Sequence, residues 1–403
     1  MSNSLLTIGM ITREAISLWE NTNLFVQNID RQYDDQFART GAKIGQQLKI
    51  RLPSDYTLRT GVTASVQDTA QQSISLPVAT QMGVDLSFTS ADLTMSVDDF
   101  APLYIEPAVN VIAGGVATAI MQGSEGGICN FVANVDGSGN VLTPTAATIL
   151  SARAVLANNS APTKNRKLVV SPITNSRAVS FLAGLFNPAA KIGEQYTSGM
   201  VSNALGYDWL EDQTVISHTT ASYSGTLTVN GAGQTGTTLT VNAITGGFAA
   251  GDIITIAGVY AVNRITKQST GQLRQFVVTA TAATGATSLS IYPAIIPPVA
   301  GQQVQYQTVT ASPANSATIT PVTNSGAVYR KNIAFIPQAV TMVTADLEAP
   351  PNVATHREVK DSIAMRYLEQ FVGLNDAWVR RFDVLFGYVW LRPEWAVVVA
   401  DAL

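Results

Sequence analysis

Residues 96–134 read SVDDFAPLYIEPAVNVIAGGVATAIMQGSEGGICNFVAN, and the rest of the chain is organised around this stretch. Ser96, followed three residues later by Asp99, predicts the N-terminal cap of a helix. Apolar residues then recur at helical spacing and would form one continuous stripe: Ile105, Ala108, Val109, Ile112, Val116, Ala119 and Ile120. We therefore predict one long helix, with a kink or a restart at Pro107.

The same stretch has no charged residue between Glu106 and Glu125, so a membrane-spanning helix is an alternative interpretation. Polar Asn110, Thr118 and Gln122 lie within or beside this apolar region, together with a proline and a pair of glycines. These residues favour a helix that is buried by protein on several sides, and we expect no membrane partner.

Charged residues are scarce in this chain. They make up 13% of its 403 residues, against about 25% in typical domains. Because sparse charge leaves little to hold molecules apart, we expect the chain to associate with copies of itself. The net charge of −4 argues against a nucleic-acid-binding protein that works through overall basicity.

Cysteine usage and the N-terminus bear on the compartment in which the protein folds. Cys129 is the single cysteine, so neither an intramolecular disulfide nor a thiolate metal cluster can form, and we expect this residue to be buried. The first ten residues lack the basic segment and apolar run of a secretory signal. We therefore expect the protein to fold in a reducing cytoplasm.

The N-terminal residues 1–45 are predicted to form an arm. Residues 11–21 have the apolar spacing of a short amphipathic helix, and charges of both signs then alternate as far as Arg59. This pattern favours a solvated or partner-facing segment and gives no basic patch for nucleic acid.

Residues 46–90 change to a period of two. Leu48, Ile50 and Leu52 alternate with polar residues, and residues 73–78 do the same. We predict an extended hairpin followed by a lead-in strand at residues 84–88. Since a two-stranded ribbon is marginally stable alone, we expect this one to lean on something outside its own domain.

Helices and short strands interleave in the centre of the chain. We expect helices at residues 146–157 and 175–186, and strands at residues 167–170 and 327–337. This mixture indicates an α+β unit.

The C-terminal region is rich in aromatic residues. Residues 384–390 are apolar on both faces, which predicts a central strand that is covered on both sides. Asp376 and Arg380 have the spacing of an ion pair on a helix, and we expect a helix to precede the strand.

Charged residues flank this aromatic strand. We expect Asp383 to be buried and paired, because an unpaired charge beside so much apolar surface is strongly destabilising. Arg392 and Glu394 flank Pro393 at the far end, and for these two residues a buried and an exposed placement both stay open.

The composition changes at residue 219. From there to residue 323 the only charged residues are Asp252, Arg264, Lys267 and Arg274. Candidate strands recur with Gly, Asn and Pro between them, at residues 225–229, 237–241, 252–256, 275–280, 288–291, 303–309 and 317–321. We predict one inserted domain, an antiparallel barrel or sandwich, over residues 219–323.

One motif suggests nucleotide binding. Gly231, Gly233 and Gly236 have the spacing of the dinucleotide fingerprint and follow a predicted strand. The fingerprint requires a helix directly after it, but residues 237–241 have a strand pattern. Asp252 lies near the offset of the ribose-binding acid and has no such role without the helix, so we do not predict a nucleotide site.

The two histidines, His218 and His356, are far apart and lack metal-ligand spacing to a carboxylate or to Cys129. We expect them to be surface or capping residues. We assign no catalytic, cofactor-binding or metal-ligating residue, and we expect no cofactor.

Three short runs of sequence carry a family resemblance: Arg380-Arg381-Phe382-Asp383-Val384-Leu385-Phe386-Gly387, Leu391-Arg392-Pro393-Glu394-Trp395-Ala396 and Gly251-Asp252-x-Ile254-x-Ile256-x-Gly258-Val259. They resemble coat proteins of short-tailed bacteriophages, whose capsid fold carries an inserted β-barrel. The order of the predicted parts is similar over nearly the whole chain. The resemblance implies the α+β tailed-phage capsid fold that is named after phage Hong Kong ninety-seven.

The resemblance also implies an organisation in five parts. These are an N-terminal arm at 1–45, an extended loop with its lead-in strand at 46–90, a peripheral domain with the spine helix at 91–160 and 345–403, an axial domain at 161–218 and 324–344, and an inserted β-barrel at 219–323. Some relatives of this fold crosslink a loop lysine to an asparagine of a neighbour. Lys43 and Lys49 lie near that region, but nothing marks a partner asparagine, so we do not transfer this chemistry.

The implied function is that of a major capsid protein. It would self-assemble into hexamers and pentamers of an icosahedral phage head enclosing double-stranded DNA. The implied partners are the protein itself, a scaffolding protein, a portal, packaged DNA held by non-specific contact with the shell interior and, as an open option, a decoration protein. Its place would be the virion capsid, after synthesis and assembly in the host cytoplasm, and the resemblance brings no enzymatic activity.

A secreted surface-layer or adhesin-like β-rich structural protein is the alternative function. The richness in Thr, Ser and Gly and the β-rich insertion suggest it. It predicts an export signal and sequence repeats, and neither is visible in the sequence. An enzyme is a third hypothesis, and the sequence offers no catalytic constellation for it.

Overall fold

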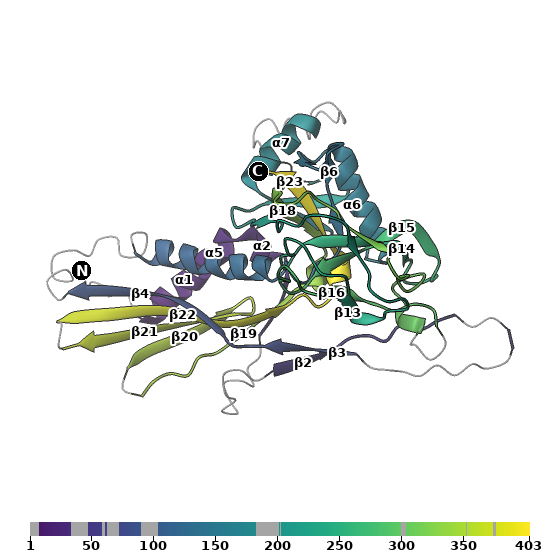
Figure 1. Ribbon diagram of the computed structural model, residues 1–403. Helices are drawn as coiled ribbons and strands as arrows, with labels where there is room; N and C mark the ends of the chain where they lie inside the picture. Colours follow the sequence, from purple (N-terminus) through teal and green to yellow (C-terminus); the bar gives the residue numbers. More distant parts are fainter. Residues whose placement is uncertain are drawn as a thin grey trace. The chain divides into compact units, whose positions relative to one another are not determined.

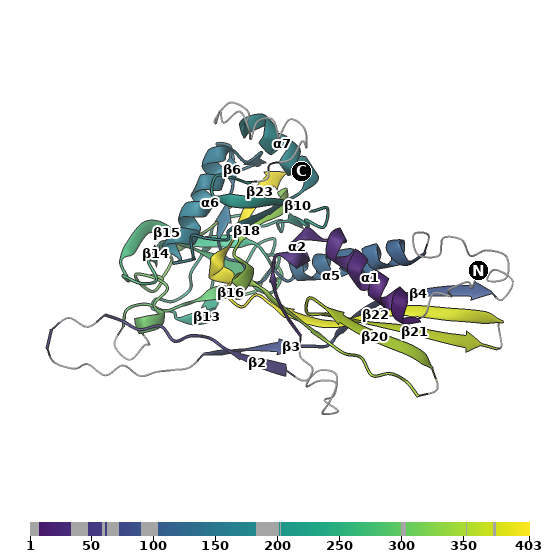
Figure 2. The ribbon, with the colours of Figure 1, turned by 180° about the vertical axis from the view of Figure 1, so that it is seen from behind.

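The computed structural model describes residues 8–33, 47–58, 61–62, 72–89, 104–182, 201, 203–299, 304–351, 353–373 and 376–403. The chain divides into two compact units, which are described separately. Unit 1 contains Met1–Arg51, Ser73–Ile120 and Val340–Leu391, and unit 2 contains Leu52–Gln72, Met121–Ala339 and Arg392–Leu403. Figures 1 and 2 show the chain from opposite sides, and both units mix helices with strands, which confirms the predicted α+β class.

Unit 1 is built on a six-stranded sheet. Its strands are β1 (Asp30–Tyr33), β4 (Thr80–Thr89), β19 (Thr341–Ala345), β20 (Ala354–Lys360), β21 (Ile363–Val372) and β22 (Ala377–Val389). β22 lies at the centre, because β21 pairs with one of its edges while β4 and β19 share the other. Residues 382–387 of β22 are all buried, so the prediction of a covered central strand is confirmed.

The prediction of a helix before this strand is wrong. Residues 377–389 form one continuous strand, and Arg380 pairs with Glu369 of β21 instead of Asp376. Side chains of Trp378, Arg380 and Phe382 alternate with their neighbours in strand fashion, and this period of two prevails over the single i, i+4 charge pair.

Helices α1 (Ile8–Thr22), α2 (Leu24–Gln27) and α5 (Glu106–Gln122) belong to the same unit. Figures 1 and 2 show α1 and α5 on the same side of the sheet. The described N-terminal residues are therefore not a solvated arm, since Ala15, Trp19 and Phe25 are buried and β1 pairs in parallel with β19. The remaining residues of the predicted arm, including Lys43, lie outside the described residues.

The central helix α5 is shorter than predicted. It begins at Glu106, with Pro107 in its first turn, where a missing N–H costs nothing. It ends at Gln122 because the following turn, residues 123–127, contains three glycines. The expected cap at Ser96 and Asp99 lies outside the described residues.

The predicted apolar stripe of α5 is confirmed in its main part. Ile105, Val109, Ile112, Val116 and Ile120 are buried. The buried face also extends over two small residues, Ala113 and Ala117. No helix in the described part of the chain combines the length and apolarity that a membrane crossing requires.

Unit 2 contains a seven-stranded sheet. Its strands are β5 (Phe131–Val132), β8 (Lys167–Val170), β9 (Asn203–Ala204), β10 (Tyr207–Glu211), β11 (Ser217–Thr219), β18 (Val328–Phe335) and β23 (Ala396–Ala402). Helices α6 (Ala146–Asn158) and α7 (Pro172–Leu182) contribute to the core of this sheet, and a small hairpin, β6 (Asn134–Val135) with β7 (Val141–Leu142), precedes α6. Thr145 caps α6 through a hydrogen bond from the backbone N–H of Thr148, so the predicted start of this helix is confirmed.

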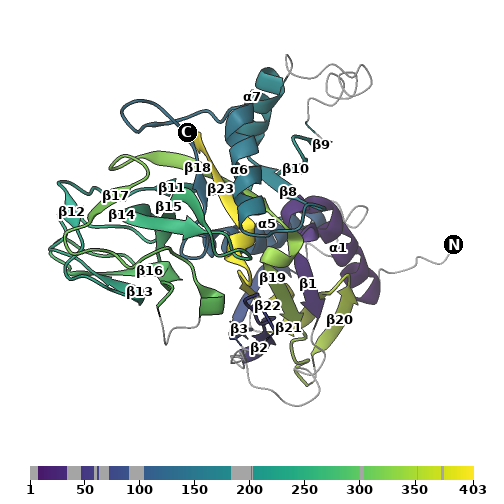
Figure 3. The ribbon, with the colours of Figure 1, turned by 90° about the vertical axis from the view of Figure 1, so that its right-hand side faces the viewer.

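A separate six-stranded antiparallel sheet occupies the region from 227 to 321, also in unit 2. Its strands are β12 (Leu227–Thr228), β13 (Gly236–Thr240), β14 (Ile253–Val262), β15 (Ser269–Val278), β16 (Ser288–Ile295) and β17 (Thr318–Pro321). The two edge strands approach each other at a bridge between Val229 and Val241. Figure 3 shows β12, β13, β14, β16 and β17 next to one another.

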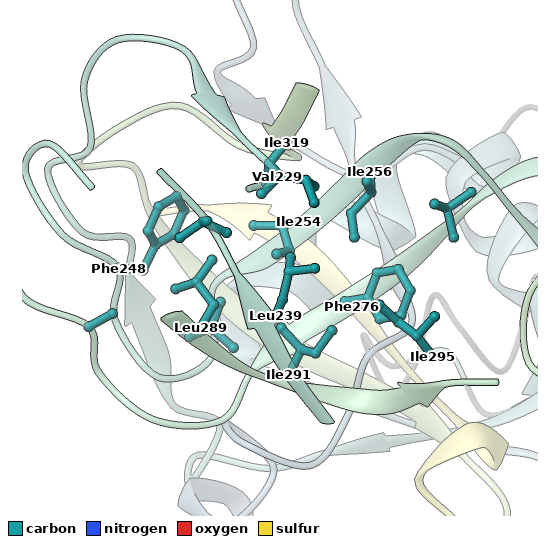
Figure 4. Close-up of a cluster of buried hydrophobic side chains, with 14 of the residues drawn as sticks. Val229, Leu239, Phe248, Ile254, Ile256, Phe276, Leu289, Ile291, Ile295 and Ile319 are labelled. Carbon is teal, nitrogen blue, oxygen red and sulfur yellow. The ribbon is translucent and has the colours of Figure 1, made fainter. Parts of the chain in front are cut away.

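This second sheet of unit 2 has an apolar core of its own. Figure 4 shows Leu239, Ile254, Phe276 and Ile291 pointing into one cluster, and every member of that cluster comes from residues 229–319. The prediction of a seventh strand at 303–309 is wrong, because residues 304–306 form the short 3-10 helix η2 (Val304–Tyr306) and Val309 makes only an isolated bridge to Ala261. Two other short 3-10 helices are η3 (Pro337–Ala339) and η4 (Pro393–Trp395).

Candidate functional site

The extended hairpin is the strongest candidate for a functional element. β2 (Gln47–Arg51) pairs with β3 (Ser73–Pro77), which confirms the two predicted strands of the hairpin, and Leu48 lies opposite Leu76 and Ile50 opposite Ile74. Leu76 and Val78 are fully buried in a cluster of unit 1 that includes residues of β19 and β22. The base of the hairpin thus packs on residues outside its own predicted segment 46–90, as expected, and these residues belong to the same subunit.

Close packing at the base of the hairpin requires a glycine on the central strand. A Cβ atom built on Gly387 of β22 would lie 2.2 Å from the carbonyl oxygen of Pro77. Any larger residue would push β3 away from the sheet. The close contact between Gly387 and Pro77 therefore fixes the position at which the hairpin leaves the sheet.

The distal segment beyond these strands has a different character. Leu58 is 93% exposed, and the side chains of Tyr56 and Val62 are also exposed. Three large apolar side chains on one short segment are unusual on a surface that has no partner. Lys49 is exposed on the polar face of β2.

One ion-pair cluster in unit 2 fixes part of this distal segment. Arg264, in the turn between β14 and β15, donates from Nε to Asp55 Oδ2 at 2.9 Å and from Nη1 to Glu394 Oε1. Burial would lower the pKa of Arg264, but the carboxylates of Glu394 and Asp55 outweigh that effect and raise it. Glu394 is thus a partly buried, paired residue.

Arg392, the other residue left open, is not part of that ion pair. Its guanidinium carbon lies 4.3 Å from the ring centroid of Trp395, which is a cation–π contact. The side chains on either side of Pro393 therefore face different partners.

Two other charged residues between 219 and 323 also have partners within unit 2. Lys267 Nζ donates to the carbonyl oxygen of Gln305 at 2.6 Å, and Arg274 Nη2 lies 3.6 Å from Cys129 Sγ. Next to Arg274, the amide of Gln275 bonds both the N–H and the carbonyl of Phe131, at 2.8 and 2.9 Å. The Gln275 side chain thus forms the hydrogen bonds that a neighbouring strand would otherwise form with the edge strand β5, and it connects β15 to β5.

Cys129 is buried, as predicted, and burial raises the pKa of its thiol. A thiol of this kind is a packing residue and a poor nucleophile at neutral pH. No described group of three or more His, Cys, Asp and Glu side chains is arranged to hold a metal ion.

The dinucleotide motif lies in a β-turn region. Gly231 and Gly233 lie between β12 and β13, and Gly236 is the first residue of β13, so a strand begins where a nucleotide site needs a helix. Asp252 is 2% exposed and accepts hydrogen bonds from backbone and from His218, so it is not available to a ribose.

The placement predicted for His218 is wrong. This residue on β11 is buried, with Nε2 3.0 Å from Asp252 Oδ1 and Nδ1 3.3 Å from Glu125 Oε1. The three residues are 93 and 34 positions apart in sequence, so no local motif could have indicated their meeting. His356 lies on β20 in unit 1, far from this group in the chain.

Asp383 is the buried, paired carboxylate that the sequence predicted. Its oxygens accept from Arg366 Nη2 at 2.5 Å and from Arg381 Nε at 2.8 Å, and its side chain has no exposed surface. Gly83 of β4 lies opposite, where a Cβ atom would come within 2.5 Å of Asp383 Oδ1. The absence of a side chain at residue 83 makes room for this ion-pair group in the sheet.

Comparisons with known proteins identify relatives of the whole chain. The family model described as "P22 coat protein - gene protein 5" matches residues 3–399. No curated protein matches the sequence.

Several solved structures are similar to this chain. "Mycobacterium phage Che8" is 10% identical, with 93% of this chain and 90% of that chain covered and a TM-score of 0.44. "Capsid structure of the Cyanophage P-SCSP1u" is 12% identical, with 94% and 88% covered and a TM-score of 0.46. "CUS-3 coat protein I-domain" is 34% identical over 24% of this chain and 96% of that chain, with a TM-score of 0.20.

Proposed function

Because the chain belongs to the P22 coat protein family, whose model matches residues 3–399, we propose that its extended hairpin makes the contacts that join subunits into a shell. The chain is a structural major capsid protein of a phage head with the tailed-phage capsid fold, as the sequence resemblance predicted. The surface-layer and adhesin alternative is thereby set aside.

The observation that carries the proposal is the exposed apolar character of the distal segment. Burying one leucine side chain contributes about 1.5–3 kcal/mol, so covering Leu58 alone would strengthen each subunit contact about tenfold or more. Tyr56 adds an aromatic ring of the kind that is enriched in protein interfaces. The exposed apolar side chains fit an apolar site on a second copy of the chain.

In this proposal the subunits form hexamers and pentamers of an icosahedral head that encloses double-stranded DNA. A scaffolding protein and a portal would take part in assembly in the host cytoplasm, and a decoration protein is an optional addition. Packaged DNA would meet the shell interior without sequence-specific contact, which is consistent with a net charge of −4 and no concentrated basic run. We also propose that the chain is organised in the five parts that the resemblance implies, from the N-terminal arm at 1–45 to the inserted β-barrel at 219–323.

The test is Leu58→Asp in the full-length protein. Because Leu58 has almost no contact with its own subunit, the subunit should fold and remain soluble, while assembly into particles should fall at least tenfold. Sedimentation and electron microscopy of the assembly products measure this directly. Val135→Asp is the matched control, since Val135 is a half-exposed apolar residue on the unrelated hairpin β6–β7 and should leave assembly unchanged.

Ile50→Asp, which the sequence alone would favour, is a less selective probe. Ile50 packs against the cluster around Leu76, so its replacement would also weaken the subunit. Normal assembly of the Leu58→Asp variant would contradict the proposed role of the distal segment. The capsid function itself rests on the family and would survive that result.

A further inference from the structure

His218 is the meeting point of three segments of unit 2. Glu125 comes from the turn after α5, His218 from β11, and Asp252 from the residue that precedes β14. Gly251 permits the close approach, because it has φ of +98° and a Cβ atom there would lie 2.8 Å from His218 Cε1. The imidazole thus links the seven-stranded sheet to the six-stranded one.

The geometry requires a particular protonation state. Each ring nitrogen of His218 faces a carboxylate oxygen, and a carboxylate can only accept. A neutral imidazole has one N–H and one lone pair, so it satisfies one carboxylate and repels the other. The doubly protonated ring satisfies both.

Asp252 cannot easily turn away from this arrangement. Its Oδ2 accepts from the backbone N–H of Ala249 at 2.8 Å and of Ala221 at 3.3 Å. Asp252 and His218 are both buried, so water does not replace a lost contact between them. Loss of one imidazole proton therefore places a lone pair against a carboxylate, and the partly exposed Glu125 is the group that can move.

Other charged and titratable groups surround the site. Lys331 and Tyr329 of β18 are buried beside β11, and the ring centroids of Tyr329 and His218 are 5.5 Å apart. Lys331 opposes protonation of His218. Burial also disfavours the imidazolium, but the hydrogen bonds to Asp252 and Glu125 outweigh both effects and raise the pKa of His218.

We propose that Glu125, His218 and Asp252 form a protonation-dependent latch that holds the six-stranded sheet of unit 2 (residues 227–321) on the seven-stranded sheet of the same unit. The latch is closed while the imidazole carries two protons, and it loosens when one proton leaves. The two sheets remain connected by Arg274 and Gln275, so loosening is a local opening and not unfolding.

The direction of the pH dependence follows from the two shifts. The pKa of His218 is raised above 6.5, so its stabilising contribution is complete below that pH and is lost as pH rises through the folded-state pKa. The pKa of Glu125 is lowered below 4.5, chiefly by its hydrogen bond to His218, so its contribution is lost only in stronger acid. The latch is therefore strongest between these two limits.

The first test is a nuclear magnetic resonance titration of the full chain with labelled histidine. The chain has only two histidines, so His356→Gln identifies the His218 signals without touching the latch. The expected result is a doubly protonated His218 at pH 6.5 and a midpoint above 6.5. Lys331→Met should shift this midpoint further upward, because it removes a nearby positive charge. A midpoint at or below 6.5, or a neutral ring at pH 6, overturns the proposal.

The second test measures opening by amide hydrogen exchange between pH 5.5 and 8.5, after correction for the intrinsic rate. Exchange in β11 and at residues 249–252 should increase with pH in the wild type and in His356→Gln. In His218→Gln exchange should already be fast at pH 5.5, because glutamine does not titrate, and only the smaller dependence contributed by Lys331, whose pKa is about 8, should remain. Equal pH dependence in the two glutamine variants overturns the latch.

Discussion

Asp383→Ala gives a direct measure of what the buried charges in unit 1 contribute. The substitution removes the acceptor of two arginines, Arg366 and Arg381, inside the central strand of the sheet. The two arginines lose different amounts of favourable interaction energy. The side chain of Arg381 is 42% exposed and still has Asp85 at 3.3 Å, whereas that of Arg366 is 12% exposed.

The magnitude therefore depends mainly on Arg366. Breaking a buried ion pair by removing one partner costs about 3–5 kcal/mol. Arg366 retains a hydrogen bond from Nη1 to the carbonyl oxygen of Glu348 at 2.7 Å, which places the expected loss near the lower limit, about 3 kcal/mol. Since whole domains are stable by only about 5–15 kcal/mol, the variant should fold but unfold at a clearly lower denaturant concentration.

The assay is urea unfolding of soluble subunits, followed by tryptophan fluorescence. Asp85→Ala is the matched control, because it removes another partner of Arg381 at an exposed position and should cost at most about 1 kcal/mol. Asp383→Asn should lie between the control and Asp383→Ala, since it keeps the shape and one acceptor oxygen. An Asp383→Ala loss below about 1 kcal/mol would refute the assignment of a large contribution to this buried pair.

Two further predictions concern unit 2. Burial lowers the pKa of Lys331 from 10.5 to about 8, so the unfolded chain binds more protons between these values and Lys331 costs stability below them. The free energy of unfolding of Lys331→Met should therefore exceed that of the wild type at pH 7 by about 1–3 kcal/mol, and the difference should shrink toward pH 10. Denaturant titrations at both pH values measure this, and a difference that is the same at pH 7 and pH 10 would contradict it. The fragment 219–323 should give a β-type circular dichroism spectrum and a cooperative melt, because its core comes entirely from residues within it, whereas a disordered fragment would show that the contacts of Asp252, Arg264 and Arg274 are indispensable.

Elements with local signals could be predicted from the sequence, and those that depend on distant partners could not. The alternation of Leu48 and Ile50 with polar residues predicted a strand of the hairpin, although not its register, and the pattern at 146–157 predicted α6 to within one residue. β1 has the polar sequence DRQY, with no alternation, and is a strand only because β19 offers it a parallel partner. Nothing local marks such a strand.

The candidate site shows the same limit. Burial of Asp383 could be predicted because apolar residues surround it in the sequence itself. The burial of His218 could not, since its carboxylate partners arrive from two other segments and its immediate neighbours are polar. Exposure of Leu58 is likewise a property of the folded chain, because an isolated leucine in a sequence is more often buried than exposed.

The pairing of β1 with β19 has a consequence for synthesis on the ribosome. Thr341 Oγ1 donates to Asp30 across 311 residues, so the parallel pair cannot form until most of the chain has been translated. At about 5–20 residues per second, α1 and β1 wait for tens of seconds with their apolar side chains uncovered. All strands of the six-stranded sheet of unit 2 lie between residues 227 and 321, and they can pair while β19 is still untranslated. The nascent chain can thus complete this sheet first, whereas unit 1 waits for β22 and the seven-stranded sheet of unit 2 waits for β23, and α1 is the segment that a holding chaperone would protect in the interval.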